Sequence, residues 1–360
     1  MVNCNINVTN EYCYLGIIFV PSGSFTKAMN RLKEKALEAY FKIRHNLFDN
    51  STKCGFKLFQ TLVQPIIGYG CEVWSPFLLN KLNNSNFLSL CDKLPGESLH
   101  IKFCKGILGV HNKSTNHAVR GELGSFPLLI HMISLSIKYW WKLNVKCHKG
   151  SSDLVTDALI DNRRLHSSGT LSWSSGIFNC LKMINRLDIW DKPNVITLSN
   201  FDDIVHSGIK EVYSDLWVKQ ITCYQAKLRT FCLFKKTFSL ENYVMMMNRS
   251  SRVSFCKLRI SAHQLMIEKG RHFNIKPEDR ICKLCDSNDV EDEFHFVMKC
   301  SFYNDLRVRL LDNFRSIYDF DSLSDRDIFI LIMSVQDYDT IHQVIQFVNS
   351  SFDKRIMHDV

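Results

Sequence analysis

Four potential metal ligands lie within nineteen residues of one another near the C-terminus: Cys282, Cys285, His295 and Cys300. Thiolate and imidazole groups are the usual ligands of Zn²⁺ in proteins, and a C-x2-C pair lets two thiolates from one tight turn bind the same ion. Because four protein ligands leave no position for water, the spacing predicts a structural zinc ion rather than a catalytic one. The alternative is that a chain with fourteen cysteines contains such a pair by chance and that His295 is an ordinary loop residue.

The segment between the two ligand pairs is acidic. We expect its carboxylates to keep the loop soluble and to accept a hydrogen bond from the second imidazole nitrogen of His295. Three further Cys and His residues lie nearby, but their spacing suits a metal site poorly and packing explains them better. The acidic residues are Asp286, Asp289, Glu291, Asp292 and Glu293, and the further Cys and His residues are Cys256, His263 and His272.

The positive charge is concentrated in two segments. The net charge is +9, but residues 101–150 carry eight Lys and Arg against one Glu, and residues 221–280 carry twelve against four acids. Basic clusters interleaved with aromatic residues are typical of nucleic-acid binding through phosphates. Three alternatives remain. The basic surface can serve solubility alone, the stems of these side chains can cover apolar surface, or acidic residues after position 300 can neutralise them. The residues from which we expect phosphate contacts are Lys257, Arg259, His263 and Arg271.

Other catalytic motifs are absent from the sequence. It contains no Gly-rich phosphate loop, no G-x-S-x-G and no H-E-x-x-H motif. No local signature therefore singles out a nucleophile, and we expect no small-molecule substrate. Trp140 and Trp141, flanked by Lys138 and Lys142, could stack nucleic-acid bases. Burial in the core is the stronger expectation for two tryptophans on an apolar helix.

Composition excludes several classes of protein. The chain has 360 residues, 46% of them hydrophobic, with only fifteen Gly and seven Pro, which excludes disordered and low-complexity chains. No apolar run approaches the roughly 20 residues of a membrane span, so we expect no membrane association. The N-terminus lacks a basic and apolar signal segment. We therefore expect an intracellular protein, in the cytoplasm or the nucleus, with reduced cysteines.

Hydrophobic periodicity predicts a mainly α protein. Residues 12–20 are β-branched and aromatic and predict one short strand. Apolar residues at alternating steps of four and three predict a helix after the N-cap Ser24. This stripe consists of Phe25, Met29, Leu32, Ala36, Tyr40, Ile43 and Leu47. Further helices are expected over 52–63, 101–108, 126–145, 177–188, 201–239 and 254–269, with Gly270 as a C-cap, and in the tail after 301, whereas the Ser-rich stretch 151–176 predicts a connector.

The sequence resembles LINE-type (non-LTR) retrotransposon reverse transcriptases in five blocks that follow the family's order. Residues 257–300, which include KLRISAHQLMIEKGRHFNIKPEDRICKLC and VEDEFHFVMKC, resemble the family's zinc-binding C-terminal region. YLGI at 14–17 resembles the strand that closes the polymerase palm. VQPIIGYGCEVW at 63–74 resembles a thumb-region motif, and FCKGILGV at 103–110 and GELG at 121–124 resemble blocks beyond the thumb.

The resemblance implies a nucleic-acid-binding protein without catalysis. Polymerase activity in the family requires palm aspartates that hold two metal ions. These precede the strand that residues 14–17 resemble, and only thirteen residues precede Tyr14 here. We therefore expect a fragment, truncated before the palm, that binds RNA or DNA through phosphates. The alternative is a structural or protein-interaction protein in which a zinc loop stabilises a helical domain.

The same resemblance implies a division of the chain into five segments. It predicts a thumb-like helical bundle with a short N-terminal β element, a helical connector and a small CCHC zinc-binding α+β module. The expected segments are a remnant strand at 1–20, a thumb-like domain at 21–150, a helical connector at 151–240, a zinc-binding region at 241–310 and an acidic helical tail at 311–360.

Overall fold

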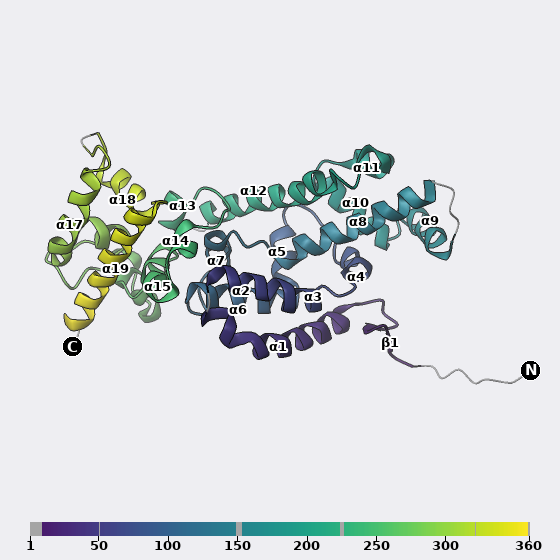
Figure 1. The fold of residues 1–360 in the computed structure, drawn as a ribbon, viewed down its shortest axis with the longest axis horizontal. Helices are drawn as coiled ribbons and strands as arrows, with labels where there is room; N and C mark the ends of the chain where they lie inside the picture. The colour runs from purple at the N-terminus through teal and green to yellow at the C-terminus, as the bar shows by residue number, and fades with distance from the viewer. Residues whose placement is uncertain (1–8, 50, 149–152, 224–226, 321, 359–360) are drawn as a thin grey trace, which may run out of the picture. The chain divides into compact units, whose positions relative to one another are not determined.

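A computed structural model describes residues 9–49, 51–148, 153–223, 227–320 and 322–358 of the protein (Figure 1). These residues form nineteen α-helices, several short 3-10 and π-helical turns, and one two-stranded antiparallel sheet near the N-terminus. The predicted mainly α fold with a short N-terminal β element is therefore confirmed. Among the described helices, none combines the length and apolar character needed to cross a membrane.

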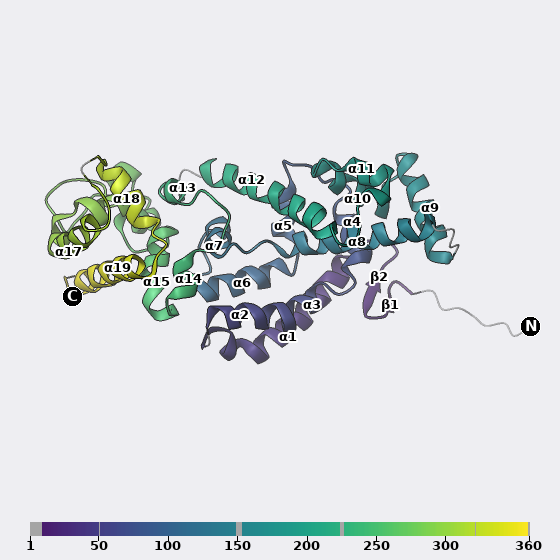
Figure 2. The same cartoon turned by 45° about the horizontal axis from the view of Figure 1, so that its top comes forward.

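The N-terminal β element is a hairpin rather than the single strand expected over residues 12–20. Strands β1 (Tyr12–Tyr14) and β2 (Ile17–Phe19) pair antiparallel (Figure 2). The chain reverses at Leu15 and Gly16, whose φ angles are 47° and 85°. A two-residue hairpin turn needs this left-handed backbone, which glycine adopts without steric conflict. The prediction of one strand was wrong because a single glycine marks the turn within an otherwise apolar run.

The chain divides into two compact units, each assembled from segments that are distant in sequence. The first unit takes its residues from 1–47, 56–100 and 126–216, and the second from 48–55, 101–125 and 217–360. These boundaries cut across the five segments expected from the sequence. The segment expected to be thumb-like, 21–150, contributes to both units, whereas the zinc-binding region and the acidic tail both belong to the second.

The first unit is a helical bundle around α8 (Leu128–His148). Helix α8 packs against α4 (Cys71–Leu78) and α9 (Leu154–Ser167), and α10 (Trp173–Met183) contacts all three. The other elements of this unit are the hairpin strands β1 and β2, η1 (Phe59–Val63), α3 (Gln64–Ile67), α5 (Phe87–Lys93), α11 (Leu187–Asp191), η2 (Pro193–Val195) and η3 (Asp202–His206). Helices α1 (Thr26–Asp49), α2 (Thr52–Leu58), α6 (Glu97–Leu108) and α12 (Ser207–Cys223) have residues in both units.

Helix α1 has the predicted apolar stripe on its buried side. It begins at Thr26, whose backbone N–H donates to Ser24 Oγ at 3.3 Å, as expected of an N-cap. Ile43 and Phe25 are half-buried, and the side chain of Leu47 lies outside the described part of the structure. The remaining stripe residues are at most 7% exposed, and they are Met29, Leu32, Ala36 and Tyr40.

The stretch 151–176, which we expected to be a connector, contains helix α9 and the first residues of α10. Asp153 and Ser172 are the N-caps of these helices, each in a capping box. Ser and Asp favour such caps because their side-chain oxygens accept the unpaired N–H groups of the first helical turn. The polar residues therefore mark helix starts within one packed unit, and the expected domain boundary does not fall there.

The core of the first unit is apolar and closely packed. Trp140 and Trp141 are both buried, so the core assignment of this pair is confirmed and base stacking is excluded. Trp140 stacks on Trp190 with ring centroids 5.2 Å apart. Helices α10 and α4 approach so closely that a Cβ atom at Gly176 would lie 1.9 Å from the carbonyl oxygen of Pro76. Only glycine permits that approach.

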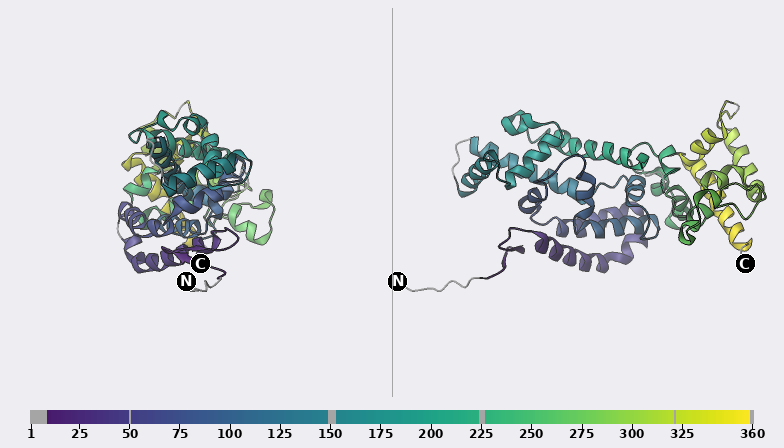
Figure 3. Two further views of the ribbon diagram at one scale, coloured as in Figure 1. Left: turned by 90° about the vertical axis from the view of Figure 1, so that its right-hand side faces the viewer. Right: turned by 180° about the vertical axis from the view of Figure 1, so that it is seen from behind.

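The second unit contains the C-terminal helices. Helix α19 (Tyr338–His358), drawn in yellow in Figure 3, packs against α15 (Arg249–Arg259), α17 (Asn304–Arg315) and α14 (Asn242–Met246). The remaining elements are α7 (Asn116–Leu123), α13 (Phe231–Phe234), α16 (Met266–Lys269), η4 (Gly270–Phe273), η5 (Pro277–Asp279), η6 (His295–Lys299), η7 (Ser301–Tyr303) and α18 (Asp325–Met333).

Candidate metal centre

A short antiparallel bridge positions the two thiols of the C-x2-C pair. Ile281 pairs with Val290, and the backbone N–H of Cys282 donates to the carbonyl of Asp289 at 2.9 Å. Asn288 has a φ angle of 56°, which asparagine tolerates and which lets the chain reverse between the paired residues. Cys282 and Cys285 therefore lie in one tight turn, as the spacing predicts.

A π-helical turn brings the second pair of ligands to the same place. The N–H of Cys300 donates to the carbonyl of His295 at 2.8 Å, so the five residues of η6 close one wide turn. Asp292 Oδ1 accepts the N–H of His295 at 2.8 Å at the start of this turn. The x4 spacing between His295 and Cys300 thus becomes one turn whose two end residues can contact the same ion.

The four ligand atoms lie within 4.8 Å of one another. The sulfurs of Cys282 and Cys300 are 3.9 Å apart, and Cys285 Sγ is 3.4 Å from His295 Nε2. In a zinc tetrahedron with ordinary bond lengths these edges measure about 3.8 Å and about 3.6 Å. Cys282, His295 and Cys300 are buried, and Cys285 is half-buried. The cluster can therefore hold a metal ion, and its geometry fits four-coordinate binding.

Protonation of the thiols opposes metal binding. Without a bound ion, the hydrogen bond with Cys300 and burial raise the pKa of Cys282 to about 12. The same hydrogen bond lowers the pKa of Cys300. Since the ligand form of cysteine is the thiolate, metal binding must release a proton from this pair, and a metal site of this kind weakens as the pH falls.

The acidic residues of the loop differ in their exposure: Asp286 and Asp289 are exposed, as a solubilising role requires, but two glutamates are buried. Glu291 and Glu293 are at most 1% exposed. Glu291 accepts the N–H of Met266 at 2.7 Å and forms an ion pair with Arg355 from α19. Asp289 lies 3.8 Å from Nδ1 of His295, too far for the predicted hydrogen bond. Glu291 and Glu293 therefore connect the metal centre to neighbouring segments.

Arg280 joins the metal centre to the preceding loop. Its guanidinium donates to the carbonyls of Ile267 and Ile275 at 2.6 Å and 2.8 Å. A Cβ atom at Gly270 would lie 2.8 Å from the Arg280 side chain. Gly270 is the C-cap of α16, as predicted, but its backbone is right-handed, and the close approach of Arg280 is what requires glycine here. Asn274, with a φ angle of 54°, adopts the left-handed conformation after η4.

Arg259, expected to contact phosphates, is buried inside the second unit. It is 1% exposed and is the last residue of α15, which ends earlier than the helix predicted over 254–269. Its Nη2 atom lies 2.9 Å from Glu122 and 3.0 Å from Glu241. The two carboxylates raise the pKa of Arg259 against the opposing effect of burial. This guanidinium is engaged within the fold, so it offers no free donor to a ligand.

His263 is also occupied by contacts within the fold. The N–H of Leu265 donates to Nδ1 at 3.3 Å, which places the proton of the neutral ring on Nε2. Nε2 donates to Glu293 at 2.8 Å, and Ser261 Oγ donates to the same carboxylate at 2.9 Å. His263 therefore stabilises the loop beside the metal centre instead of offering a donor to a ligand.

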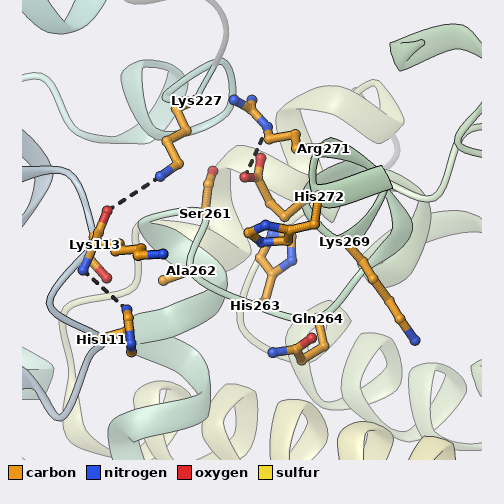
Figure 4. A pocket seen from close by; sticks show the side chains of 12 residues that line it. His111, Lys113, Lys227, Ser261, Ala262, His263, Gln264, Lys269, Arg271 and His272 are labelled. Carbon is orange, nitrogen blue, oxygen red and sulfur yellow. Dashed lines mark hydrogen bonds and ion pairs between the residues drawn. The ribbon is translucent and has the colours of Figure 1, made fainter. Parts of the chain in front are cut away.

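The other two predicted contact residues keep access to solvent. Lys257 is half-buried on α15. The side chain of Arg271 is 28% exposed, and its Nε atom lies 3.1 Å from Glu268. Arg271 lines a cavity of about 300 Å³ together with basic residues that sequence reasoning did not single out, among them Lys113 and Lys227 (Figure 4). The two basic segments of the sequence indicated that cations gather in these parts of the chain. That Lys113 and Lys227 line the same cavity follows only from the fold.

Comparisons with known proteins add no relative. A scan against protein-family models, a search of curated proteins and a search of solved structures each find no match for the chain.

Proposed function

We propose that this chain is a non-catalytic nucleic-acid-binding protein whose Cys282, Cys285, His295 and Cys300 side chains hold one structural zinc ion. The observation that carries the proposal is the four-ligand cluster, which directly follows the basic segment 221–280. Three thiolates and one imidazole form a donor set that favours zinc over magnesium or calcium, which prefer oxygen. The ion would organise the short turns around it and leave no open position for substrate.

Exposed positive charge supports binding to RNA or DNA. Residues 221–280 contain twelve Lys and Arg, and eight of these are exposed or half-buried. Such side chains bind phosphates without reading sequence. The four that are buried and therefore do not contribute are Lys235, Arg252, Arg259 and Arg280.

The family resemblance supports the same assignment. The five blocks that resemble LINE-type reverse transcriptases include the zinc region, and in that family the palm carries the polymerase aspartates. We propose that this 360-residue chain binds nucleic acid without extending primers. We place it inside the cell, in the cytoplasm or nucleus, because none of the thirteen cysteines that the structure describes forms a disulfide.

The proposal is tested by fluorescence anisotropy of labelled RNA, single-stranded DNA and duplex DNA with the zinc-loaded protein. Affinity should fall linearly on a log–log salt plot, with a slope of about −3 to −5 for a handful of phosphate contacts. A primer-extension assay on the same sample should yield no product. Absence of any salt-dependent binding at low ionic strength would contradict the proposal, and so would primer extension.

A second candidate is a structural or protein-interaction protein without nucleic acid. The observation that favours it is the internal neutralisation of basic side chains, since Arg259 is paired with Glu122 and Glu241, and Arg355 of the tail with Glu291. Under this candidate the zinc ion would still be required for folding. The salt titration separates the two, because only the nucleic-acid proposal predicts binding.

A further inference from the structure

A positively charged cavity lies in the second unit, formed by three loop segments (111–114, 227 and 261–264) and α16 with its η4 extension (Figure 4). Its volume is about 300 Å³, enough for a phosphate group and its attached sugar. One loop comes from the first basic segment of the sequence and the rest from the second. The Lys, Arg and His residues that line it are His111, Lys113, Lys227, His263, Lys269, Arg271 and His272.

The charge of the lining favours an anion. Lys113 and Lys227 come from distant segments and lie side by side at one side of the cavity, which Lys269 and Arg271 also line (Figure 4). The one carboxylate in the lining, Glu268, is already paired with Arg271 and with Arg229, whose Nη1 atom lies 3.1 Å away. Four cations against one carboxylate leave a formal charge of +3. An anion would thus relieve repulsion among side chains that the fold holds together.

The loop that carries Lys113 is fixed before any ligand arrives. Its turn is closed by the N–H of Ser114, which donates to the carbonyl of His111 at 2.9 Å. Lys105 Nζ donates to the carbonyl of Asn112 at 2.6 Å. Lys227 Nζ lies 3.4 Å from the carbonyl of Lys113 and links the two basic segments. Preorganisation of this kind lowers the entropy lost on binding.

Two neutral donors complete the lining. The N–H of Lys113 donates to Nδ1 of His111 at 3.1 Å, so the neutral ring carries its proton on Nε2. Ser114 is 8% exposed, and its hydroxyl is buried without a hydrogen-bond partner. A buried hydroxyl without a partner is costly, and an oxyanion in the cavity would accept its hydrogen bond.

We infer that this cavity binds a phosphate of a nucleic-acid strand. The lining contains no Trp, Tyr or Phe, so it offers no aromatic platform for a base, and recognition is confined to the phosphate. The inference rests on the proposed function and deepens it, because it identifies where the strand is held. Binding at this cavity is therefore independent of base sequence.

The test uses the full-length, zinc-loaded chain and a double variant, Lys113→Gln with Lys227→Gln. The matched control is Lys236→Gln with Lys276→Gln, which removes two exposed cations of the same basic segment outside the cavity. Binding of a single-stranded RNA is measured by anisotropy at low ionic strength, and binding of inorganic phosphate by ³¹P NMR. Circular dichroism and zinc content show that all three proteins are folded.

The cavity variant should bind RNA about a hundredfold more weakly, because each charge-assisted hydrogen bond to a phosphate accounts for about tenfold in affinity. Its salt slope should be less steep by about two. The control should stay within about threefold of the wild type, and only the wild type and the control should broaden the phosphate signal. If the cavity variant and the control bind RNA with equal affinity, the inference that the cavity holds the strand is overturned, whereas the proposed nucleic-acid binding stands. A third outcome is that the wild type binds no RNA but broadens the phosphate signal, and that the cavity variant does not broaden it. The cavity would then bind a free oxyanion, and the inference that it binds a nucleic-acid strand would be overturned.

Discussion

The core of the first unit and the metal centre of the second differ in what stabilises them. Helices α4, α8 and α10 bury large apolar side chains such as Trp74 and Trp140. The metal centre instead buries Glu291, Glu293 and His263 in short turns around the ligand cluster. Apolar burial is non-directional and spread over many side chains, whereas metal ligands and ion pairs are few and directional. Long periodic helices therefore tolerate the truncation of one side chain better than the turns of the metal centre do.

Loss of a metal ligand should have the largest effect. Structural zinc contributes about 10–16 kcal/mol of apparent binding energy in small peptides, and four-ligand sites depend on every ligand. Cys285→Ser or His295→Ala should lower the zinc content from one ion per chain to none and expose residues 264–303 to protease. Cys223→Ser is the matched control, because Cys223 is an exposed free thiol of the same unit. A Cys285→Ser variant that still binds one ion tightly would contradict the assignment.

The buried ion pairs of the second unit should come next. Arg259→Met leaves Glu122 and Glu241 buried without their guanidinium, which should lower the free energy of unfolding by about 3–5 kcal/mol. Lys257→Met on the same helix changes a half-buried side chain and should cost less than about 0.5 kcal/mol. Chemical denaturation measures both. Equal stability of the two variants would show that Arg259 is not held as the structure describes.

The close packing of the first unit should give a smaller effect. Gly176→Ala forces a methyl group into the backbone of α4 and should destabilise the protein by about 1–3 kcal/mol. Gly208→Ala is its control, because the nearest side-chain atoms there are 3.6 Å from the added methyl. This control should be neutral or stabilising by up to about 1 kcal/mol. Zinc content should stay unchanged in both variants. A loss of zinc in Gly176→Ala would show that the metal centre depends on the packing of the first unit, which would contradict the comparison.

The smallest effect concerns pH. Burial alone would raise the pKa of Glu241, but the nearby charges of Arg259 and Lys235 outweigh it and lower this pKa. An unfolded glutamate titrates at about 4.3, so the stabilising contribution is fully present above that pH and is lost as the pH falls below it. The stability advantage of the wild type over Glu241→Gln should therefore shrink on acidification. The exposed Glu278→Gln control should show no such trend in urea unfolding between neutral and acidic pH.

The fold could be predicted wherever a periodic pattern decides the structure. The stripe from Met29 to Tyr40 is buried as expected, because its spacing matches one face of a helix. The hairpin at Leu15 and Gly16 and the early end of α15 at Arg259 were missed. Both depend on single residues with turn or capping geometry, which a hydrophobic pattern does not record.

The candidate site divides in the same manner. The four ligands are local in sequence, so their spacing was enough to find them. Arg259 is different, since Glu122 lies 137 residues away and only the tertiary structure shows that the two pair. Lys113 and Lys227, which line the cavity together, are 114 residues apart. Burial and long-range pairing of charged residues are properties of the fold rather than of the residue type.

The central claim is that a metal ion stabilises the turns of residues 264–303 in the second unit, whereas apolar packing stabilises the first unit. It is tested most directly by hydrogen exchange of one sample with and without a zinc chelator. We predict that backbone amides of residues 264–303 lose protection on chelation, whereas those of α4, α8 and α10 keep theirs. Zinc added back should restore protection. Identical exchange of residues 264–303 in the loaded and chelated protein would contradict the claim.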